Sequence, residues 1–183
     1  MLPRRTRLIQ TLTAALLLPL FFVSLPLGHA TPVSSVESRS KAEDFSLENL
    51  QGRRVALSVY QGKVVVVNFW ATWCAPCKRE LPHLSKMYTA LKEKGLVVLA
   101  VSMDDARTRS AVRPLVRRRR WKMPVLLDLQ GRVVEQMNPQ KRAPYTVFID
   151  RAGRVASAHE GYHAGDEVQM RAVIEQLLAE SAE

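Results

Sequence analysis

The feature that most constrains the fold is an unbroken apolar run followed within a few residues by two cysteines. Residues 64–69 read Val-Val-Val-Val-Asn-Phe, and a β-branched run without alternation is typical of a strand buried on both faces. Cys74 and Cys77 follow, and a helical pattern continues from there to about Lys94. This order predicts that both cysteines lie where a buried strand ends and a helix begins.

The chain from residue 44 onward alternates between strand and helix patterns. Residues 45–50 and 53–57 flank a Gln-Gly turn, as in a short β-hairpin. The other expected elements are a second buried strand at 96–101, a helix at 110–120, strands at 125–127, 145–149 and 155–159, and a last helix at 166–180. The order predicts an α/β sandwich whose two main strands are parallel and joined by a right-handed crossover.

The first 30 residues have the pattern of an export signal. No charged residue occurs between Arg7 and Glu37, arginines precede this stretch, and small residues stand at −3 and −1 of a cut after Ala30. An uncleaved anchor is the alternative, because about 20 apolar residues can span a bilayer, and residues 8–27 would then associate with the membrane. We therefore expect a signal peptide or anchor at 1–30, a polar, Ser-rich linker at 31–43 and an exported domain at 44–183.

The charge of the chain indicates what it binds. The formal net charge is +10, and residues 1–30 contribute three arginines and no acid. A positive charge favours acidic partners or anionic lipid headgroups, and the motif and aromatic interleaving of a nucleic-acid binder are missing from the sequence. Residues 117–120 are four consecutive arginines, interpreted either as a solvated helix end, which the helix dipole favours, or as a docking patch.

The position of the cysteine pair favours redox chemistry. Free N–H groups and the positive end of the dipole at a helix start stabilise a thiolate on Cys74, which makes it a nucleophile. Cys77, one turn further in, is expected to be shielded and to attack a mixed disulfide formed on Cys74. A structural disulfide is one alternative, although so short a loop contributes only about 1.9 kcal/mol. Half of a metal site is another, with only His83 near in sequence.

The residues around the pair resemble those of exported thioredoxin-like proteins of the TlpA/ResA type. The similarity comprises residues 68–82, Asn-Phe-Trp-Ala-Thr-Trp-Cys-Ala-Pro-Cys-Lys-Arg-Glu-Leu-Pro, and includes 124–128 and 143–150 within a region from about 44 to 178. This resemblance implies a thioredoxin fold, with a central mixed sheet flanked by helices and an added N-terminal β-hairpin. It also implies thiol–disulfide exchange in the bacterial periplasm or on the outer face of the cell membrane.

The family pattern implies that Pro144 is a cis-proline facing the cysteines. The backbone of Ala143 is then free to pair with an extended substrate peptide. From the residues alone, the alternative is an ordinary trans proline at the start of an edge strand. Trp73 is expected to be a partly exposed contact surface for the substrate, whereas Trp70 is expected to pack inside.

Glu80 is the candidate general base. It lies three residues after Cys77 on roughly the same helical face, so a partly buried carboxyl there can take the Cys77 proton. A solvated helix carboxylate is the alternative. Cytoplasmic-type thioredoxins have a buried Asp in the strand before the cysteines, where this chain has Asn68, which leaves Glu80 as the only nearby candidate.

These observations predict an exported thiol–disulfide oxidoreductase that uses no cofactor and no metal. The expected partners are a disulfide-bearing protein substrate and an upstream membrane thiol reductant, not nucleic acid. A reductant that serves cytochrome c maturation is the most specific role implied by the resemblance, although the direction depends on a reduction potential that a sequence does not give. Two other functions on the same fold are a metal carrier, for instance for copper, and a non-catalytic binding module.

Overall fold

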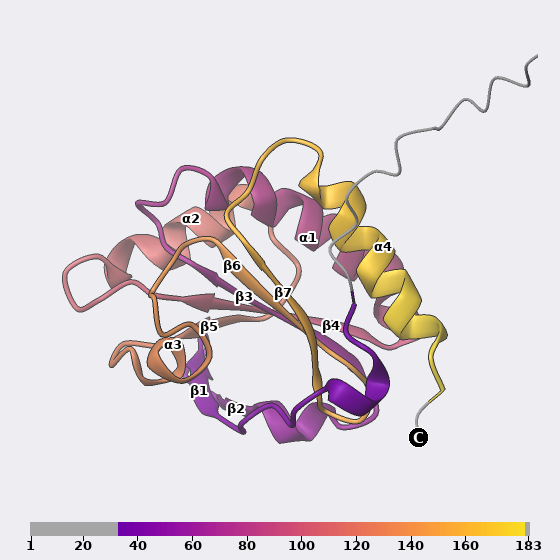
Figure 1. Cartoon of the computed structure of the whole chain (residues 1–183). Coiled ribbons are helices and arrows are strands. Elements are labelled where there is room, and N and C mark those ends of the chain that lie inside the picture. The colour runs from indigo at the N-terminus through magenta and orange to yellow at the C-terminus, as the bar shows by residue number, and fades with distance from the viewer. Residues whose placement is uncertain (1–32, 182–183) are drawn as a thin grey trace, which may run out of the picture.

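The computed structural model describes residues 33–181, which form one mixed sheet covered by helices on both faces (Figure 1). The seven strands have the order β2-β1-β5-β4-β3-β6-β7. The elements are β1 (Ser46–Asn49), β2 (Arg54–Ala56), β3 (Val64–Trp70), α1 (Cys77–Leu91), β4 (Leu96–Ser102), α2 (Val112–Arg119), β5 (Val125–Leu127), α3 (Arg132–Met137), β6 (Tyr145–Ile149), β7 (Val155–Glu160) and α4 (Asp166–Ala179). This is the predicted α/β architecture with an N-terminal hairpin.

The centre of the sheet explains the unbroken apolar run. All seven residues of β3 are buried, and β3 pairs in parallel with β4 and antiparallel with β6. The predicted parallel pairing is therefore confirmed. Because β3 and β4 run in the same direction and β6 runs against them, the ends of β3 and β4 share one edge with the beginning of β6. The cysteine pair follows β3 at that edge.

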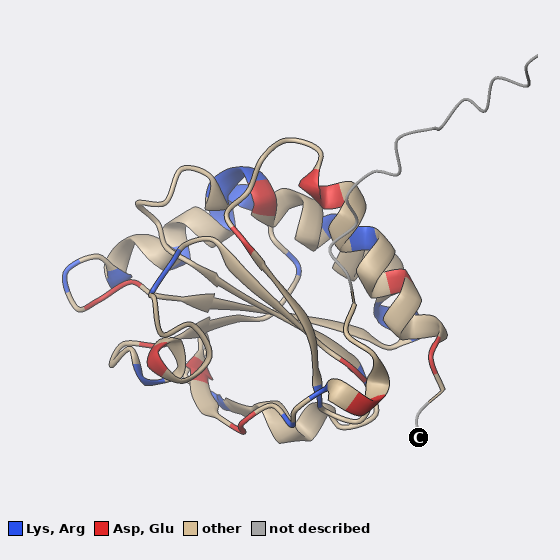
Figure 2. Cartoon of the chain, in the orientation of Figure 1, with Lys and Arg blue, Asp and Glu red and all other residues tan. Residues whose placement is uncertain are grey.

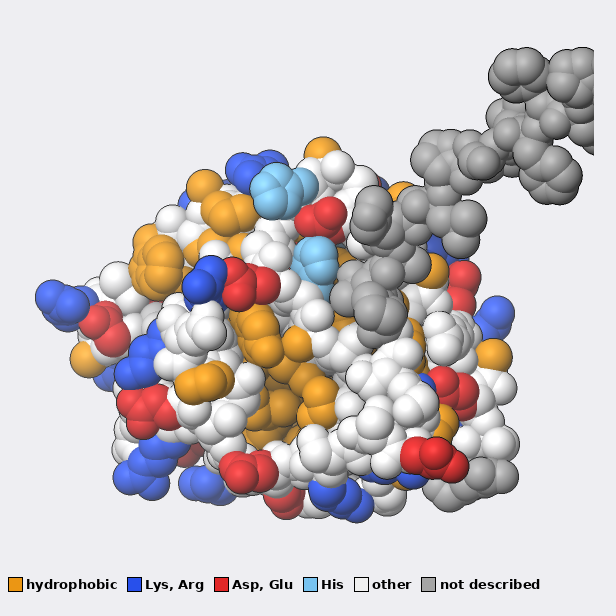
Figure 3. All heavy atoms as spheres, in the orientation of Figure 1, with side chains coloured by type: hydrophobic (Ala, Val, Ile, Leu, Met, Phe, Trp, Pro, Cys, Tyr) orange, Lys and Arg blue, Asp and Glu red, His pale blue; other side chains and the backbone are white. Residues whose placement is uncertain are grey.

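Two apolar cores lie on the two faces of the sheet because successive residues of a strand point to opposite sides. Val64 and Val66 of β3 pack with α1, α2 and α4, whereas Val65 and Val67 pack with α3, the first hairpin and the 3-10 turn at Leu57–Tyr60. Figure 1 shows α1 and α4 on one side of the sheet and α3 on the other. A shallow hollow with apolar walls opens between β7, α3 and residues 41–43 (Figure 3).

One α-helix was not predicted. Gly131 has a left-handed backbone, with φ of 68°, and α3 begins directly after it. Val133 and Val134 of α3 are buried, and the Asp128 carboxylate accepts the backbone N–H of Val134 at 2.8 Å. A helix of six residues is too short to show a helical period in the sequence, which is why it was not predicted. Its packing against the sheet holds it in place.

The segment before the first hairpin lies against the fold. Backbone hydrogen bonds join Ser34 to Ala156 and Ala42 to Gly153, and the Val155 N–H donates to Ser40. The Arg39 guanidinium is buried between Asp150, at 3.1 Å, and Glu180, at 2.6 Å. Residues 34–42, which belong to the expected linker at 31–43, are thus hydrogen-bonded to the domain that follows them.

Residues 1–32, which contain the expected leader, its cut after Ala30 and the apolar stretch at 8–27, lie outside the described residues. Among residues 33–181, no helix is long and apolar enough to cross a membrane.

Candidate active site

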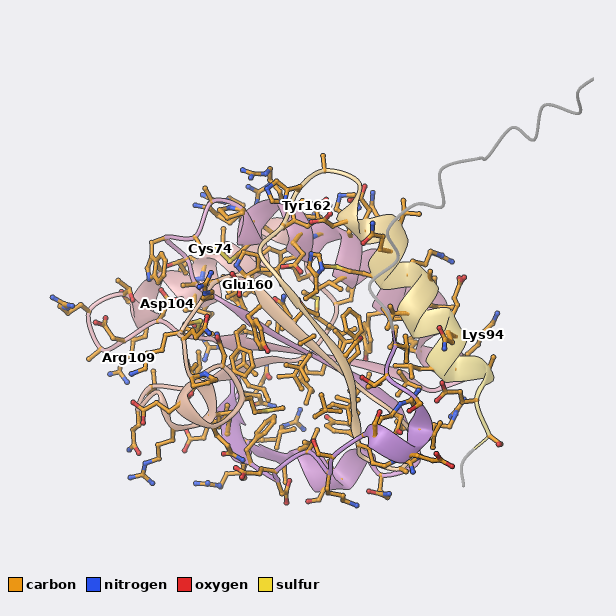
Figure 4. The ribbon with its side chains drawn as sticks, in the orientation of Figure 1. Cys74, Lys94, Asp104, Arg109, Glu160 and Tyr162 are labelled. Carbon is orange, nitrogen blue, oxygen red and sulfur yellow. A yellow bond between two sulfur atoms is a disulfide. The ribbon has the colours of Figure 1, made fainter. Side chains whose placement is uncertain are left out.

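The cysteine pair lies between β3 and α1 and is joined in a disulfide. The sulfur atoms are 1.96 Å apart and the two Cα atoms 5.4 Å apart. Cys77 is fully buried, as predicted, whereas Cys74 retains 4% of its surface exposed. The backbone N–H of Cys77 donates to the Cys74 Sγ at 3.1 Å, so an N–H of the first helical turn points at this sulfur. Figure 4 shows Cys74 in the same part of the molecule as Asp104 and away from Lys94.

The two tryptophans before the pair lie in different environments. Trp73 is 60% exposed beside Cys74, and Trp70 is completely buried, as predicted for each. The Trp70 ring stands edge-on to Trp121, with ring centroids 5.2 Å apart. An exposed aromatic surface therefore adjoins the more accessible cysteine.

Glu80 lies entirely inside the protein. The Asn68 Nδ2 donates to Oε2 of this carboxyl at 3.0 Å, and the Thr146 Oγ1 donates to Oε1 at 2.9 Å. Burial raises the pKa of Glu80 to about 7, the two hydrogen bonds lower it in part, and the charge of Asp166 raises it further. The interpretation of Glu80 as a solvated carboxylate is therefore wrong.

The sheet register explains the position of Glu80. Asn68 on β3 and Thr146 on β6 are paired residues, and the Asn68 Nδ2 also donates to the Thr146 Oγ1 at 2.8 Å. Glu80 is one helical turn beyond Cys77 on α1, so the buried face of the helix carries both side chains over this strand pair. In the sequence, Asn68 was noted only because it stands where cytoplasmic-type thioredoxins have an Asp. In the structure, its side chain donates a hydrogen bond to Glu80.

The third segment at this edge is the turn before β6. The peptide bond between Ala143 and Pro144 is cis, as predicted, and the Gly161 N–H donates to the Pro144 carbonyl at 2.8 Å. Tyr145 pairs with Phe69, so Pro144 lies beside the end of β3 from which the cysteine segment begins. Ala143 packs against the apolar cluster that contains both cysteines.

A buried acid that the sequence reasoning did not single out supports the cysteine segment. One oxygen of Asp104 accepts the Thr72 N–H at 2.9 Å and the Ser102 hydroxyl at 2.9 Å, and the other accepts the Thr72 hydroxyl at 2.5 Å. The Lys78 ammonium donates to the Thr72 carbonyl at 3.1 Å. Asp104 thus joins the end of β4 to the turn that precedes Trp73. Its position two residues after the end of a buried strand parallel to β3 is the signal by which the sequence could have identified it.

Residues 33–181 contain no group of three or more His, Cys, Asp or Glu side chains arranged to hold a metal ion. The four consecutive arginines lie at the end of α2, where all four are exposed. Arg120, with φ of 54°, ends the helix.

Comparisons with known proteins agree with this site. The sequence matches the AhpC/TSA family over residues 39–158. It is 30% identical to the thiol-disulfide oxidoreductase ResA of Bacillus thuringiensis subsp. konkukian over 142 residues, 78% of this chain and 80% of the relative. It is 33% identical to the ResA of Bacillus subtilis over 127 residues, 69% of each chain. The crystal structure of a candidate thiol:disulfide interchange protein DsbE from Chlorobium tepidum is similar, with 30% identity and a TM-score of 0.71, covering 77% of this chain and 97% of that one.

Proposed function

Because this chain belongs to the thioredoxin-like AhpC/TSA family and is a thiol–disulfide oxidoreductase, we propose that it reduces disulfides of partner proteins outside the cytoplasm. The observation that carries the proposal is the stacking of Cys74, Cys77 and Glu80. Cys74 lies just before α1, and Cys77 and Glu80 follow at three-residue spacing on the buried face of the helix, so that only Cys74 keeps any exposed surface.

The proposed reaction has two displacement steps. The Cys74 thiolate attacks one sulfur of the partner disulfide, a mixed disulfide forms, and the other partner sulfur leaves as a thiolate. The Cys77 thiolate then attacks the Cys74 sulfur, which releases the second partner thiol and forms the Cys74–Cys77 disulfide. Two electrons pass to the partner. The remaining exposure of Cys74 and the burial of Cys77 support this division of roles.

Glu80 is the proposed general base for the second step. Cys77 must lose its proton before it can attack, and in a site closed to water a protein group has to accept it. A buried carboxyl with a pKa of about 7 is divided between its two protonation states at neutral pH, which suits both accepting and releasing a proton.

The proposed substrate contacts are Trp73, Ala143 and Pro144. Trp73 offers an exposed apolar surface beside Cys74. The backbone of Ala143, two residues before β6, offers a site where an extended peptide can pair next to the cysteines.

The finer role is also a proposal. The leader-like pattern of residues 1–30 supports export, either as a cleaved periplasmic protein or as one tethered to the outer face of the inner membrane. There an upstream membrane thiol reductant would return the pair to the dithiol form. Within such a system, cytochrome c maturation is the most specific proposed task, and the reactions use no cofactor or metal.

Two cysteine variants test the proposal. Cys74→Ser is expected to abolish reduction of insulin, because the nucleophile is lost. Cys77→Ser is expected to accumulate mixed disulfides with host proteins, because nothing resolves them, and their identification by mass spectrometry would name the substrates. Wild-type insulin reduction by both variants would refute the redox role.

A further inference from the structure

The excess positive charge of the protein is concentrated in one segment. Residues 105–122, which include α2, contain eight arginines or lysines and one acid. The rest of residues 33–181 contains sixteen such cations and fifteen acids, which is close to neutral. Figure 2 shows both signs of charge on α4, whereas α2 carries only positive side chains.

Most cations of this segment also lack an acidic partner. On α4, Arg171 contacts Glu175 at 2.9 Å, and Lys141 near α3 contacts Glu135 at 2.8 Å. In the segment 105–122, only Arg107 contacts an acid, Asp105. The dipole of α2 favours cations in its last turn, so the helix can carry several arginines there. Their charge remains available to a partner.

A groove connects this segment to the active site. Its walls are residues of the cysteine segment and α1 on one side, and of α2 and the residue before it on the other: Thr72, Lys78, Ala111, Pro114, Leu115 and Arg118. Thr72 lies two residues before Cys74, and Lys78 directly follows Cys77. Figure 4 shows Cys74 and Arg109 toward one end of the molecule and Lys94 toward the other. The groove is therefore lined by residues that flank the cysteine pair in the sequence.

We propose that this groove, with the cations of residues 105–122 around it, binds an acidic segment next to the disulfide of the partner protein. The proposal rests on the function proposed above and adds a chemical class of substrate to it. The unpaired charges of Arg117–Arg120 attract the acidic segment during encounter, and Lys78 and Arg118 are positioned to hold it beside the cysteines.

Two synthetic peptides test the preference. Each contains one intramolecular disulfide, and the residues beside the cysteines are glutamates in one peptide and glutamines in the other. The reduced protein is mixed with each peptide in a single turnover, and free peptide thiols are measured by mass spectrometry. We expect the acidic peptide to react about tenfold faster in about 20 mM salt and with no preference in about 0.5 M salt. Equal rates at low salt would overturn the docking proposal, whereas no reduction of either peptide would overturn the proposed function.

Two matched double variants locate the preference. R117E/R118E and K92E/K94E change the net charge equally, but Lys94 of the second pair lies toward the opposite end of the molecule from Arg109 (Figure 4). We expect the tenfold preference to disappear in R117E/R118E and to remain in K92E/K94E. If R117E/R118E folds poorly because it places acids at the end of the helix, R117Q/R118Q replaces it, and the same loss of preference for the acidic peptide is expected. An equal loss of preference in both double variants would show that only total charge matters and would overturn the proposal.

An anionic membrane is the other surface that such cations attract. Sedimentation with vesicles of phosphatidylglycerol and phosphatidylcholine distinguishes it. Vesicle binding that is lost in R117E/R118E, together with equal rates for the two peptides, would assign the cations to lipid and overturn the proposal.

Discussion

Two buried carboxyl groups lie near opposite ends of β6, and their surroundings differ in kind. Glu80 contacts Thr146 near the first residue of the strand and receives hydrogen bonds only from neutral donors. Asp150 directly follows the strand and contacts the guanidinium groups of Arg39 and Arg154. Burial raises the pKa of Glu80 to about 7. Burial also acts to raise the pKa of Asp150, but hydrogen bonds from the Arg154 backbone and from both guanidinium groups outweigh it and hold that pKa below its usual value.

The comparison shows how one sheet supports two uses of a buried acid. Cations hold Asp150 in its charged form, so it serves to connect the N-terminal segment, β6 and the end of α4. Neutral donors leave Glu80 able to change its protonation state near neutral pH. The second arrangement suits proton transfer, and it lies at the end of the sheet where the cysteines are.

The largest expected effect is on the rate of disulfide reduction in Glu80→Gln. The amide keeps the size of the side chain but cannot accept a proton, so single-turnover reduction should slow by about 10²–10⁴-fold near pH 7. The wild-type rate should rise as pH passes through about 7, where Glu80 loses its proton, and the variant should lack this rise. Glu175→Gln, on exposed α4, is the control. Overlapping pH profiles for wild type and Glu80→Gln would remove Glu80 from the mechanism.

Asp150→Asn should act on stability instead of rate. Arg39 would remain buried with only Glu180 as a charged partner, which should lower the free energy of unfolding by about 3 kcal/mol. Because the pKa of Asp150 is lowered in the fold, its contribution is present above the usual carboxyl pKa and is lost as pH falls through the lowered value. Urea denaturation of the oxidised proteins measures the difference. An unchanged midpoint, or a loss of reduction rate as large as that of Glu80→Gln, would contradict the comparison.

The pH dependence of stability should have the opposite sign for Glu80. Its folded pKa is above its unfolded value of 4.5, so the folded state holds the proton more tightly and stability falls as pH rises from about 4.5 to about 7. Across this range the wild type should lose up to about 3 kcal/mol relative to Glu80→Gln. Denaturation of both oxidised proteins at the two ends of the range tests this. A difference that does not change with pH would mean that Glu80 titrates normally.

The smallest expected effect comes from Thr146→Val, which removes one donor to Glu80 and keeps the shape of the side chain. One hydrogen bond contributes about 0.5–1.5 kcal/mol, so the pKa of Glu80 should rise by about one unit or less. The rise of the reduction rate should shift to higher pH by the same amount. Ser157→Ala on β7 is a control in the same sheet. A shift to lower pH would show that Thr146 does not stabilise the carboxylate.

The predictable part of the fold is the part with strong periodicity. The run at 64–69 and the last helix at 166–180 were both predicted, and the structure places β3 at Val64–Trp70 and α4 at Asp166–Ala179. The helix α3 was missed because six residues do not complete two turns. The antiparallel pairing of β1 with β5 was also not predicted, because nothing local in a strand specifies a neighbour far away in the chain.

The site shows the same limit. The positions of Cys77 and Glu80 follow from helical spacing and the family resemblance; Cys77 is buried as expected, whereas Glu80, expected to be partly buried, is completely buried. The hydrogen bonds of Asn68 to Glu80 and of Asp104 to Thr72 each join different elements, so local sequence patterns could not predict them. The sequence therefore identified the reacting groups more readily than the groups that hold them in position.

The backbone bonds between residues 34–42 and residues 153–156 have a consequence for handling the protein. As the last strand of the sheet, β7 would otherwise present the unpaired N–H and C=O groups of its first residues, Val155 and Ala156, which are a template for edge-to-edge association with another copy. A truncated protein that starts at β1, the first regular strand, would retain every residue of the cysteine site but lose this cover. Its defects would then be a lower free energy of unfolding, because Arg39 is lost, and aggregation that increases with protein concentration, and not weaker chemistry in each folded molecule.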